Sequence, residues 1–458
     1  VLVPFWLTLV YNVCAAAADG AHPHGAAPHT CFFFSELAAY HKHLLNDTMI
    51  ASNLRPWKNS VNVSATVSLI NATPETNFHL FFVTLQGLAP PASNSSAHIS
   101  LIFERLQDRS FTRALVVNYF DGSFLAGVWL PTQASEWQLS SKGTWTITVV
   151  LEYIHGQAWP KDSVLSLTKA VRSPWWYIGS RLPVSHGPPL NPSSCSSCPL
   201  VVQKLERHGL ACSTLDLVSS LKFGFWQDRQ WIAAGSKSTV ELLPCLRKIN
   251  IVIIGDSTSK YFAAALRKAR VQKVTFHEVW GLKKINIKFR GTDTHEPATF
   301  DKWLRLIKNS QPRTQSQRTN HLHARTIVVL NSGIHDIARD NLFSSFSDSL
   351  KSLKSTLLLT NQNNSEFVWR LTNSIHESAI SNRKKFTASY KNTMTSLRNE
   401  VNTFLAADIM LPEVPILDGF LPSRCAPDSM MMPGDIRHLT KAGYDPWVRS
   451  LASFACAS

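Results

Sequence analysis

The sequence is poor in charged side chains, which make up 17% of its 458 residues, whereas hydrophobic residues make up 44%. A disordered chain has the opposite balance, so that class is excluded, and the composition does not fit a coiled coil either. Long apolar runs are missing beyond the first residues, which excludes a membrane protein with several spans. The length exceeds one ordinary core and predicts two domains.

Acidic residues are scarcer than basic ones, 31 against 46, and the formal net charge is +15. Residues 1–200 hold 11 Lys and Arg against 10 Asp and Glu, which leaves 35 and 21 for residues 201–458. The second half is therefore basic and the first nearly neutral, a contrast that supports a domain division. A basic half favours nucleic acid, an anionic membrane or an acidic glycan as partner.

Residues 1–18 are typical of a signal peptide, with an apolar stretch followed by the small residues Ala15–Ala18. The alternative is a truncated signal anchor, which would give the chain a membrane anchor at its N-terminus. Both interpretations place the protein in the secretory pathway, as a secreted, Golgi or cell-surface protein. Five N-x-[ST] sequons agree with this localisation and are glycosylation candidates: Asn46, Asn62, Asn71, Asn94 and Asn363.

Seven cysteines remain when Cys14 of the leader is set aside, so one thiol is free or forms an intermolecular bond. Cys195 and Cys198 have the spacing of a zinc half-site, but no second pair accompanies them, and structural disulfides are favoured over a metal site. No metal and no cofactor are expected. Cys425 and Cys456 are one candidate pair, although the connectivity does not follow from the sequence.

Residues 60–155 predict a β-sandwich of immunoglobulin or filamin type. Apolar and polar residues alternate along Val61–Ile70, as in a strand that is buried on one face. Further strand-like runs are Phe78–Leu85, His98–Glu104, Ala114–Phe120, Phe124–Trp129 and Thr144–Tyr153.

Residues 156–240 are rich in proline, glycine and serine, which predicts an irregular linker or extension that also contains Trp and Cys. The aromatic residues of Phe223–Trp226 and Trp231 are compatible with a platform for a sugar. Burial of their aromatic area between the two domains is the favoured interpretation.

Residues 241–458 alternate between strand and helix, which predicts a parallel sheet covered by helices on both faces, a three-layer α/β domain. The strands are expected at Ile249–Ile254, Lys273–Trp280, Thr326–Leu330 and Val414–Leu417. The helices are expected at Ser259–Arg270, Phe300–Lys308, Phe343–Leu358 and Thr387–Leu405.

The strand Ile249–Ile254 ends in Gly255-Asp256-Ser257, and a helix follows. Ligands of open α/β sheets bind at the carboxyl ends of the strands, so Ser257 is placed where a nucleophile would be exposed. Its own N–H lies near a helix N-terminus and can stabilise an oxyanion. The alternative is a turn in which Ser257 caps the helix.

A serine nucleophile needs a base, and the base needs a carboxylate that orients it. Asp435 and His438, three residues apart near the end of the chain, fit these two roles. The alternative is a surface loop with a solvated histidine.

The order of these motifs, with Asp435 178 residues after Ser257, resembles the SGNH (GDSL-like) hydrolase fold. In that fold the oxyanion hole combines the nucleophile's N–H with a glycine after the second strand and an asparagine after a later one. The resemblance assigns these roles to Ser257, Gly281 and Asn331. The usual Gly-x-Asn-Asp motif has His335 at its asparagine position here, so His335 is a substitute donor.

The Gly255–Thr258 motif, the preceding Trp- and Cys-containing segment and the expected sandwich together resemble the neurexophilin and PC-esterase domain family. The resemblance implies a catalytic triad of Ser257, Asp435 and His438. It also implies addition or removal of O-acetyl groups on glycans, and an acetyl donor would be required for a transferase. The glycan is expected to be acidic, and nucleic acid is not expected as a partner because no nucleic-acid motif is present. The alternative from another class is a secreted ligand or glycan-binding protein on a degenerate esterase fold.

Overall fold

A computed structural model describes most of the elements expected from the sequence. The described residues are 28–46, 63–70, 77–87, 97–119, 121–130, 145–155, 175–190, 215–233, 243–279, 281–282, 299–310, 325–334, 343–360, 365–376, 396–433 and 435–456. The expected signal peptide or anchor at 1–18, the Cys195–Cys198 pair and the sequons at Asn62, Asn71, Asn94 and Asn363 lie outside them. Asn46 is the last residue of a helix.

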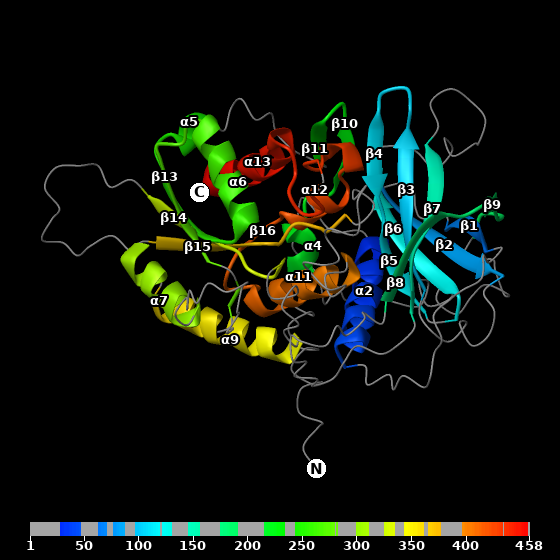
Figure 1. Cartoon of the computed structure of the whole chain (residues 1–458), viewed down its shortest axis with the longest axis horizontal. Helices are drawn as coiled ribbons and strands as arrows, with labels where there is room; N and C mark the ends of the chain where they lie inside the picture. The colour runs from blue at the N-terminus through cyan, green and yellow to red at the C-terminus, as the bar shows by residue number, and fades with distance from the viewer. Residues whose placement is uncertain are drawn as a thin grey trace, which may run out of the picture.

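The first half of the described chain forms two sheets whose strands are mostly antiparallel (Figure 1). The first sheet has the order β5 (Leu115–Asn118), β6 (Ser123–Trp129), β2 (Phe78–Gln86), β1 (Ser64–Ile70) and β9 (Val184–His186). The second has the order β11 (Gln230–Ala233), β10 (Gly224–Gln227), β4 (Ser110–Arg113), β3 (Ala97–Arg105), β7 (Thr146–His155) and β8 (Trp175–Arg181).

The alternating runs of the sequence form strands because one set of side chains enters a core between the two sheets. Val67 and Phe81 of the first sheet share this core with Ile99 and Phe103 of the second, and each is at most 2% exposed. The run expected at Ala114–Phe120 contains β5, whereas β4, which directly precedes that run, was not expected and belongs to the other sheet. Residues expected as a linker supply β8 to β11.

The second half forms an all-parallel sheet in the order β13 (Lys273–Glu278), β12 (Asn250–Gly255), β14 (Thr326–Leu330), β15 (Ser365–Arg370) and β16 (Ile416–Leu417). In chain order this is 2-1-3-4-5, so the direction of winding reverses between β12 and β14. Such a switch point is where open α/β sheets bind ligands. The expected parallel α/β sheet is confirmed, and β15 is a strand that the sequence did not predict.

Helices cover both faces of the parallel sheet (Figure 1). Ile251 and Ile253 of β12 face the helices α6 and α13, whereas Ile254 faces the layer that contains α7, α9 and α11. This alternation explains why β12 is apolar from Ile251 to Ile254. The helices are α4 (Leu215–Ser220), α5 (Leu243–Leu246), α6 (Ser257–Lys268), α7 (Thr299–Ser310), α9 (Phe343–Thr360), α11 (Ser396–Met410), α12 (Phe420–Arg424) and α13 (Asp445–Cys456).

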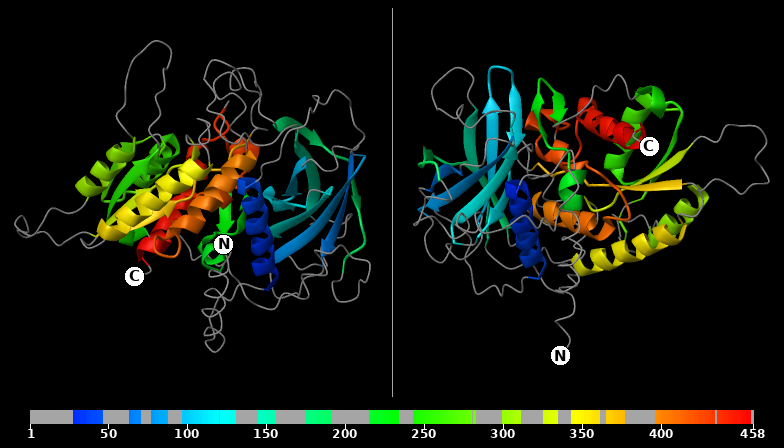
Figure 2. Two further views of the ribbon diagram at one scale, coloured as in Figure 1. Left: turned by 90° about the horizontal axis from the view of Figure 1, so that it is seen from below. Right: turned by 180° about the vertical axis from the view of Figure 1, so that it is seen from behind.

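An unexpected helix, α2 (Pro28–Asn46), lies between the two halves (Figures 1 and 2). Its Phe33, Phe34 and Leu37 are at most 1% exposed and share one core with Phe78 and Leu80 of β2 and with residues of α9 and α11. The β2, β5 and β6 part of the first sheet is therefore buried on both faces. Apolar burial of this extent holds the two halves together.

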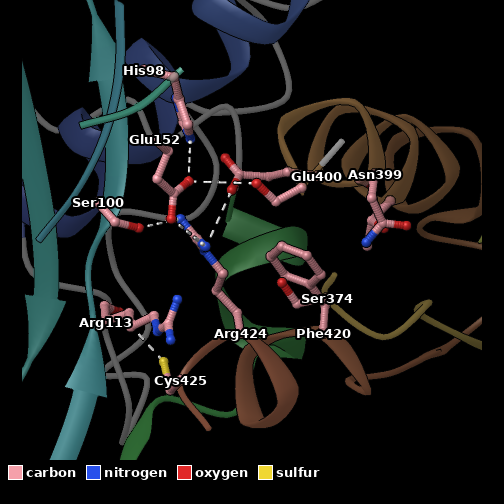
Figure 3. Close-up of polar contacts among 12 residues, drawn as sticks. His98, Ser100, Arg113, Glu152, Ser374, Asn399, Glu400, Phe420, Arg424 and Cys425 are labelled. Carbon is pink, nitrogen blue, oxygen red and sulfur yellow. Dashed lines mark hydrogen bonds and ion pairs between the residues drawn. The ribbon is translucent and has the colours of Figure 1, made fainter. Parts of the chain in front are cut away.

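Charged side chains are also buried where the halves meet (Figure 3). Arg424 of α12 lies 4.0 Å from a carboxylate oxygen of Glu152 in β7 and 3.9 Å from one of Glu400 in α11. It also donates to Ser100 Oγ of β3 at 3.1 Å. His98 of β3 approaches Glu152 at 3.5 Å. We call these five residues the interface cluster.

The aromatic segment predicted to be buried between domains has that position. Phe225, Trp226 and Trp231 are at most 5% exposed, and Trp226 Nε1–H donates to the carbonyl of Pro422 at 2.8 Å. An open sugar platform at these rings is therefore not what the structure shows.

Cys456 of α13 forms a disulfide with Cys245 of α5, and Cys425 is a buried free thiol. The candidate Cys425–Cys456 pair is therefore wrong. Cys425 is held instead against Arg113 of β4, whose carbonyl accepts from its Sγ at 3.4 Å. Cys31 of α2 is also disulfide-bonded. Within the described ranges no helix is long and apolar enough to cross a membrane.

Candidate active site

Ser257 is the first residue of α6 and directly follows the turn at the end of β12. Asp256 is the N-cap of this helix: its backbone is extended (φ −82°, ψ −167°) and its Oδ1 accepts from the N–H of Thr258 at 2.9 Å. The cap is therefore Asp256 and not Ser257. The Ser257 hydroxyl is left for other contacts, and its N–H lies at a helix N-terminus.

Gly255 permits this turn because its neighbours leave no room for a side chain. A Cβ built on Gly255 would lie 2.4 Å from Ser259 Oγ and 3.0 Å from the carbonyl oxygen of Asn331. The first turn of α6 therefore packs directly against the segment that follows β14.

The structure brings Ser257, His438 and Asp435 together. Ser257 Oγ lies 2.8 Å from His438 Nε2, and Asp435 Oδ2 lies 2.6 Å from His438 Nδ1. With the proton on Nδ1, the imidazole donates to Asp435 and its Nε2 accepts from the Ser257 hydroxyl. This is the geometry in which a histidine removes the proton of a serine nucleophile. His438 is 6% exposed, so the expectation of a solvated surface histidine is excluded.

Asp435 is held as a carboxylate by the groups around it. Burial alone raises the pKa of Asp435, but the hydrogen bond and charge of His438 outweigh burial, so the pKa lies below its usual value. Its Oδ1 also accepts from the backbone N–H groups of Arg437 and His438, at 2.9 and 3.2 Å. The carboxylate therefore fixes both the loop and the imidazole.

The loop that carries Asp435 and His438 is braced from several directions. The N–H of Met432 donates to the carbonyl of His438 at 2.8 Å, and the N–H of His376 donates to the carbonyl of Ile436 at 2.8 Å. The Tyr261 ring of α6 lies 5.0 Å from the His438 ring. The imidazole is thus set by contacts from both the nucleophile's helix and the segment after β15.

Gly281, a candidate oxyanion donor, follows β13, the neighbour of β12 in the sheet. Its φ of +86° is in the left-handed region that favours glycine, and its carbonyl accepts from Trp303 Nε1–H at 3.1 Å. This hydrogen bond holds the carbonyl of Gly281 in place. The role of the Gly281 N–H as an oxyanion donor stays a prediction.

Asn331 does not present its side chain as an oxyanion donor. Its Nδ2 hydrogens point to the carbonyl of Arg370 at 2.9 Å and to Thr372 Oγ1 at 3.1 Å, and the residue is 0% exposed. The expectation that its amide completes an oxyanion hole is therefore not met, because both N–H groups have protein partners. The substitute donor His335 lies outside the described residues.

Arg370, at the carboxyl end of β15, is a residue of this site that the sequence interpretation missed. Its guanidinium is 0% exposed and lies under the first turn of α6, where it contacts Thr258 and Ser259. The signal was present in the Ser365–Arg370 segment, which is strand-like and follows a helix. An arginine that ends such a strand lies at the same sheet edge as Ser257. Among the described residues, no group of acidic, histidine and cysteine side chains is arranged to hold a metal ion.

A scan against protein-family models and a search of curated proteins found no match. Among solved structures the chain is similar to a GDSL-like lipase from Bacteroides thetaiotaomicron (13% identity, 46% of this chain and 89% of that one, TM-score 0.30). It is also similar to an acetylxylan esterase from Geobacillus stearothermophilus (11% identity, 44% and 92%, TM-score 0.26). TM-scores this low do not by themselves establish a common fold, so the chemistry of the site follows from its own geometry.

Proposed function

We propose that the protein is a serine-dependent O-acyl esterase or transferase that acts on O-acetyl groups of glycans in the secretory pathway or at the cell surface. The observation that carries this proposal is the continuous set of hydrogen bonds from Asp435 through His438 to Ser257 at the carboxyl end of β12. It supports a fold of SGNH type for residues 243–456, with Ser257, His438 and Asp435 as the triad.

In the proposed reaction Ser257 Oγ bonds to the carbonyl carbon of an acetyl ester while its proton moves to His438 Nε2. The oxyanion that forms is stabilised by the N–H of Ser257, at the N-terminus of α6, and by Gly281. The ester C–O bond then breaks, and His438 returns the proton to the departing alcohol. An acetyl-serine remains.

The acceptor of that acetyl group decides between the two activities. Water activated by His438 releases acetate and makes an esterase, whereas a sugar hydroxyl makes a transferase that needs an acetyl donor. Both acceptors use the same protein atoms, so the triad is common to both activities.

The glycan part of the proposal is supported by the resemblance to the neurexophilin and PC-esterase domain family. That resemblance also carries the immunoglobulin or filamin type of the two-sheet half. The sequons and the Cys245–Cys456 disulfide fit an oxidising compartment. The net charge of residues 201–458 favours an acidic glycan over a neutral one.

The test is labelling with a fluorophosphonate, which reacts with activated serines, followed by assays with an acetyl ester and a panel of acetylated glycans. We expect labelling of the wild-type protein and none of Ser257→Ala at equal folded content. Activity should fall with added salt for an acidic glycan more than for a neutral one. A folded Ser257→Ala protein with wild-type activity would contradict the proposal.

One observation favours a second candidate function, a non-catalytic ligand or glycan-binding protein. Both side-chain N–H groups of Asn331 are hydrogen-bonded within the protein, so the oxyanion site has fewer donors than the SGNH fold provides. Absence of labelling in a well-folded wild-type protein that still binds glycans would favour this candidate.

A further inference from the structure

Arg370 is a fully buried cation behind the nucleophile, and among the described residues no carboxylate accepts a hydrogen bond from its guanidinium. Its Nη2 donates to Thr258 Oγ1 at 2.7 Å, to Asn331 Oδ1 at 2.8 Å and to Ser259 Oγ at 3.1 Å. Burial lowers the pKa of Arg370 to about 10, so it remains a cation at neutral pH. The negative charge of Asp256 offsets part of this burial, but Asp256 is connected to the guanidinium only through Thr258. A buried cation without a direct ion pair is costly, which calls for a function.

One set of hydrogen bonds, the first arm, connects Arg370 to the Asp256–Ser259 turn that carries the nucleophile. Thr258 Oγ1 accepts from Arg370 and donates to Asp256 Oδ1 at 2.6 Å, so Thr258 connects the cation to the carboxylate that caps α6. Asp256 and Thr258 are the two residues on either side of Ser257. The direction of the Ser257 side chain is therefore set by a turn held at both neighbours.

The second arm reaches the loop that carries the histidine. Arg370 Nη1 donates to Asn373 Oδ1 at 2.9 Å, and Asn373 Nδ2 donates to the carbonyl of Arg437 at 3.1 Å. Arg437 directly precedes His438. The backbone N–H of Asn373's neighbour Ser374 is held in turn by Ser423 Oγ at 2.8 Å.

The guanidinium plane is fixed between these arms. Its carbon lies 4.9 Å from the centre of the Trp447 ring and 5.9 Å from that of Phe262. A planar fork with several donors, stacked on aromatic rings, can hold two segments at a set distance, which a lysine ammonium cannot.

We propose that Arg370 is a positioning residue that holds the Asp256–Ser259 turn and the Asp435–His438 loop in register, with Asn331 and Asn373 as its acceptors. This inference rests on the proposed function, because Arg370 is proposed to keep the nucleophile Ser257 and its base His438 at hydrogen-bond distance. It also gives Asn331 a role. Its Oδ1 accepts from the Arg370 guanidinium, and its N–H groups donate to the Arg370 carbonyl and to Thr372 Oγ1.

The test compares two arginines that are both fully buried. Arg370→Lys keeps a cation but removes the fork, and Arg424→Lys makes the same change in the interface cluster. For each protein we would measure the unfolding temperature, the rate of fluorophosphonate labelling and the downfield proton resonance of His438 Nδ1–H. Loss of that resonance in Asp435→Asn assigns it.

We expect Arg370→Lys to slow labelling about 100-fold or more, since a displacement of about 1 Å between reacting groups has an effect of that order. Its His438 resonance should broaden or vanish. Arg424→Lys should lower the unfolding temperature but keep the resonance and label within about twofold of the wild type. A folded Arg370→Lys with wild-type labelling and resonance, or an equal loss in both variants, overturns the inference.

Two further variants keep the test decisive. Asn373→Ala cuts the arm to the histidine loop, so the resonance should weaken although Arg370 is intact. If Arg370→Lys does not fold, Thr258→Val removes one hydroxyl at nearly constant volume, and wild-type labelling of that variant overturns the inference. If the wild type is not labelled, the proposed function fails, while dependence of the His438 resonance on Arg370 still supports the positioning role.

Discussion

Two buried arginines, Arg370 and Arg424, lie in different regions of the molecule and have different partners. Arg424 lies where the two halves meet, within 4.0 Å of Glu152 and Glu400, so its charge is compensated by carboxylates (Figure 3). Arg370 lies under the nucleophile turn and its hydrogen bonds go to hydroxyl and amide oxygens. The same side chain is thus paired directly with carboxylates in one region, whereas in the other it donates to neutral acceptors and is connected to the Asp256 carboxylate only through Thr258.

The difference indicates what each region contributes. Burial raises the pKa values of Glu152 and Glu400, but the neighbouring cation and histidines outweigh it, so both carboxyls remain ionised. The interface cluster is therefore a balanced set whose members stabilise the junction together. The groups around Arg370 are hydrogen-bonded to the segments that carry Ser257 and His438. They therefore contribute to the geometry of the site. Changes in the first region should affect stability, and changes in the second should affect activity.

The largest effect is expected at the orienting carboxylate. Asp435→Asn keeps the shape of the side chain but cannot hold His438 with its proton on Nδ1. By analogy with other serine triads we expect kcat to fall by up to about 10⁴-fold. Steady-state kinetics on an acetyl ester measure this, with the unfolding temperature as control. A loss smaller than about tenfold would remove Asp435 from the triad.

For Arg424→Met we expect a loss of stability and little change in activity, because the substitution leaves Glu152 and Glu400 buried without the Arg424 cation. Removing one partner of a buried ion pair destabilises a protein by about 3–5 kcal/mol. Denaturant unfolding measures this free energy, and kcat of the protein that remains folded should change little. A stable Arg424→Met protein with low kcat would erase the distinction between the two regions.

Gly255→Ala should moderately lower both the stability of the protein and the rate at which Ser257 is labelled. The new methyl group meets Ser259 Oγ and the Asn331 backbone, and a strained insertion of this kind costs about 1–3 kcal/mol. The first turn of α6 must shift, so labelling of Ser257 should slow as well. A matched Ala265→Gly variant on the same helix should lower stability without slowing the labelling. Unchanged labelling in Gly255→Ala would show that the turn tolerates displacement.

The smallest effect is expected from mild acid. Burial lowers the pKa of His98 below 6.5, although Glu152 and Glu400 raise it in part and Arg424 and His41 lower it further. The unfolded state then binds the proton more readily, so stability is full above about pH 6.5 and declines as the pH falls towards the folded-state pKa. The unfolding temperature should therefore drop between pH 7.5 and 5.5, and less so in His98→Gln. An equal drop in both proteins would assign the effect to other histidines, such as His376.

Much of the α/β half could be predicted from local pattern. The strand Ile249–Ile254 and the helix after it differ from the observed β12 and α6 by at most two residues at each end. Buried parallel strands are apolar throughout, which makes them easy to recognise. The pairing of Ser257 with Asp435 and His438 followed from the order of motifs, and the hydrogen bonds fit it.

Other features were missed because they depend on neighbours far away in the sequence. Helix α2 was not predicted, since its apolar residues face strands and helices from both halves. The pairing of Cys456 with Cys245 joins α13 to α5 across 211 residues, a connection that no local pattern contains. Asn331 was assigned to the oxyanion hole although its amide serves Arg370 and Thr372.

The sequence by itself determined four of the five parallel strands, the motif at the end of β12 and the Asp–His pair near the C-terminus, because each depends on residues that are close together in the chain. The tertiary structure decided what lies behind the site. Arg370 acquires its partners from β12's turn, the segment after β14 and the segment after β15, which meet at one edge of the sheet. Hydrogen bonds of a buried guanidinium require all three segments at fixed distances, and only the folded sheet sets those distances.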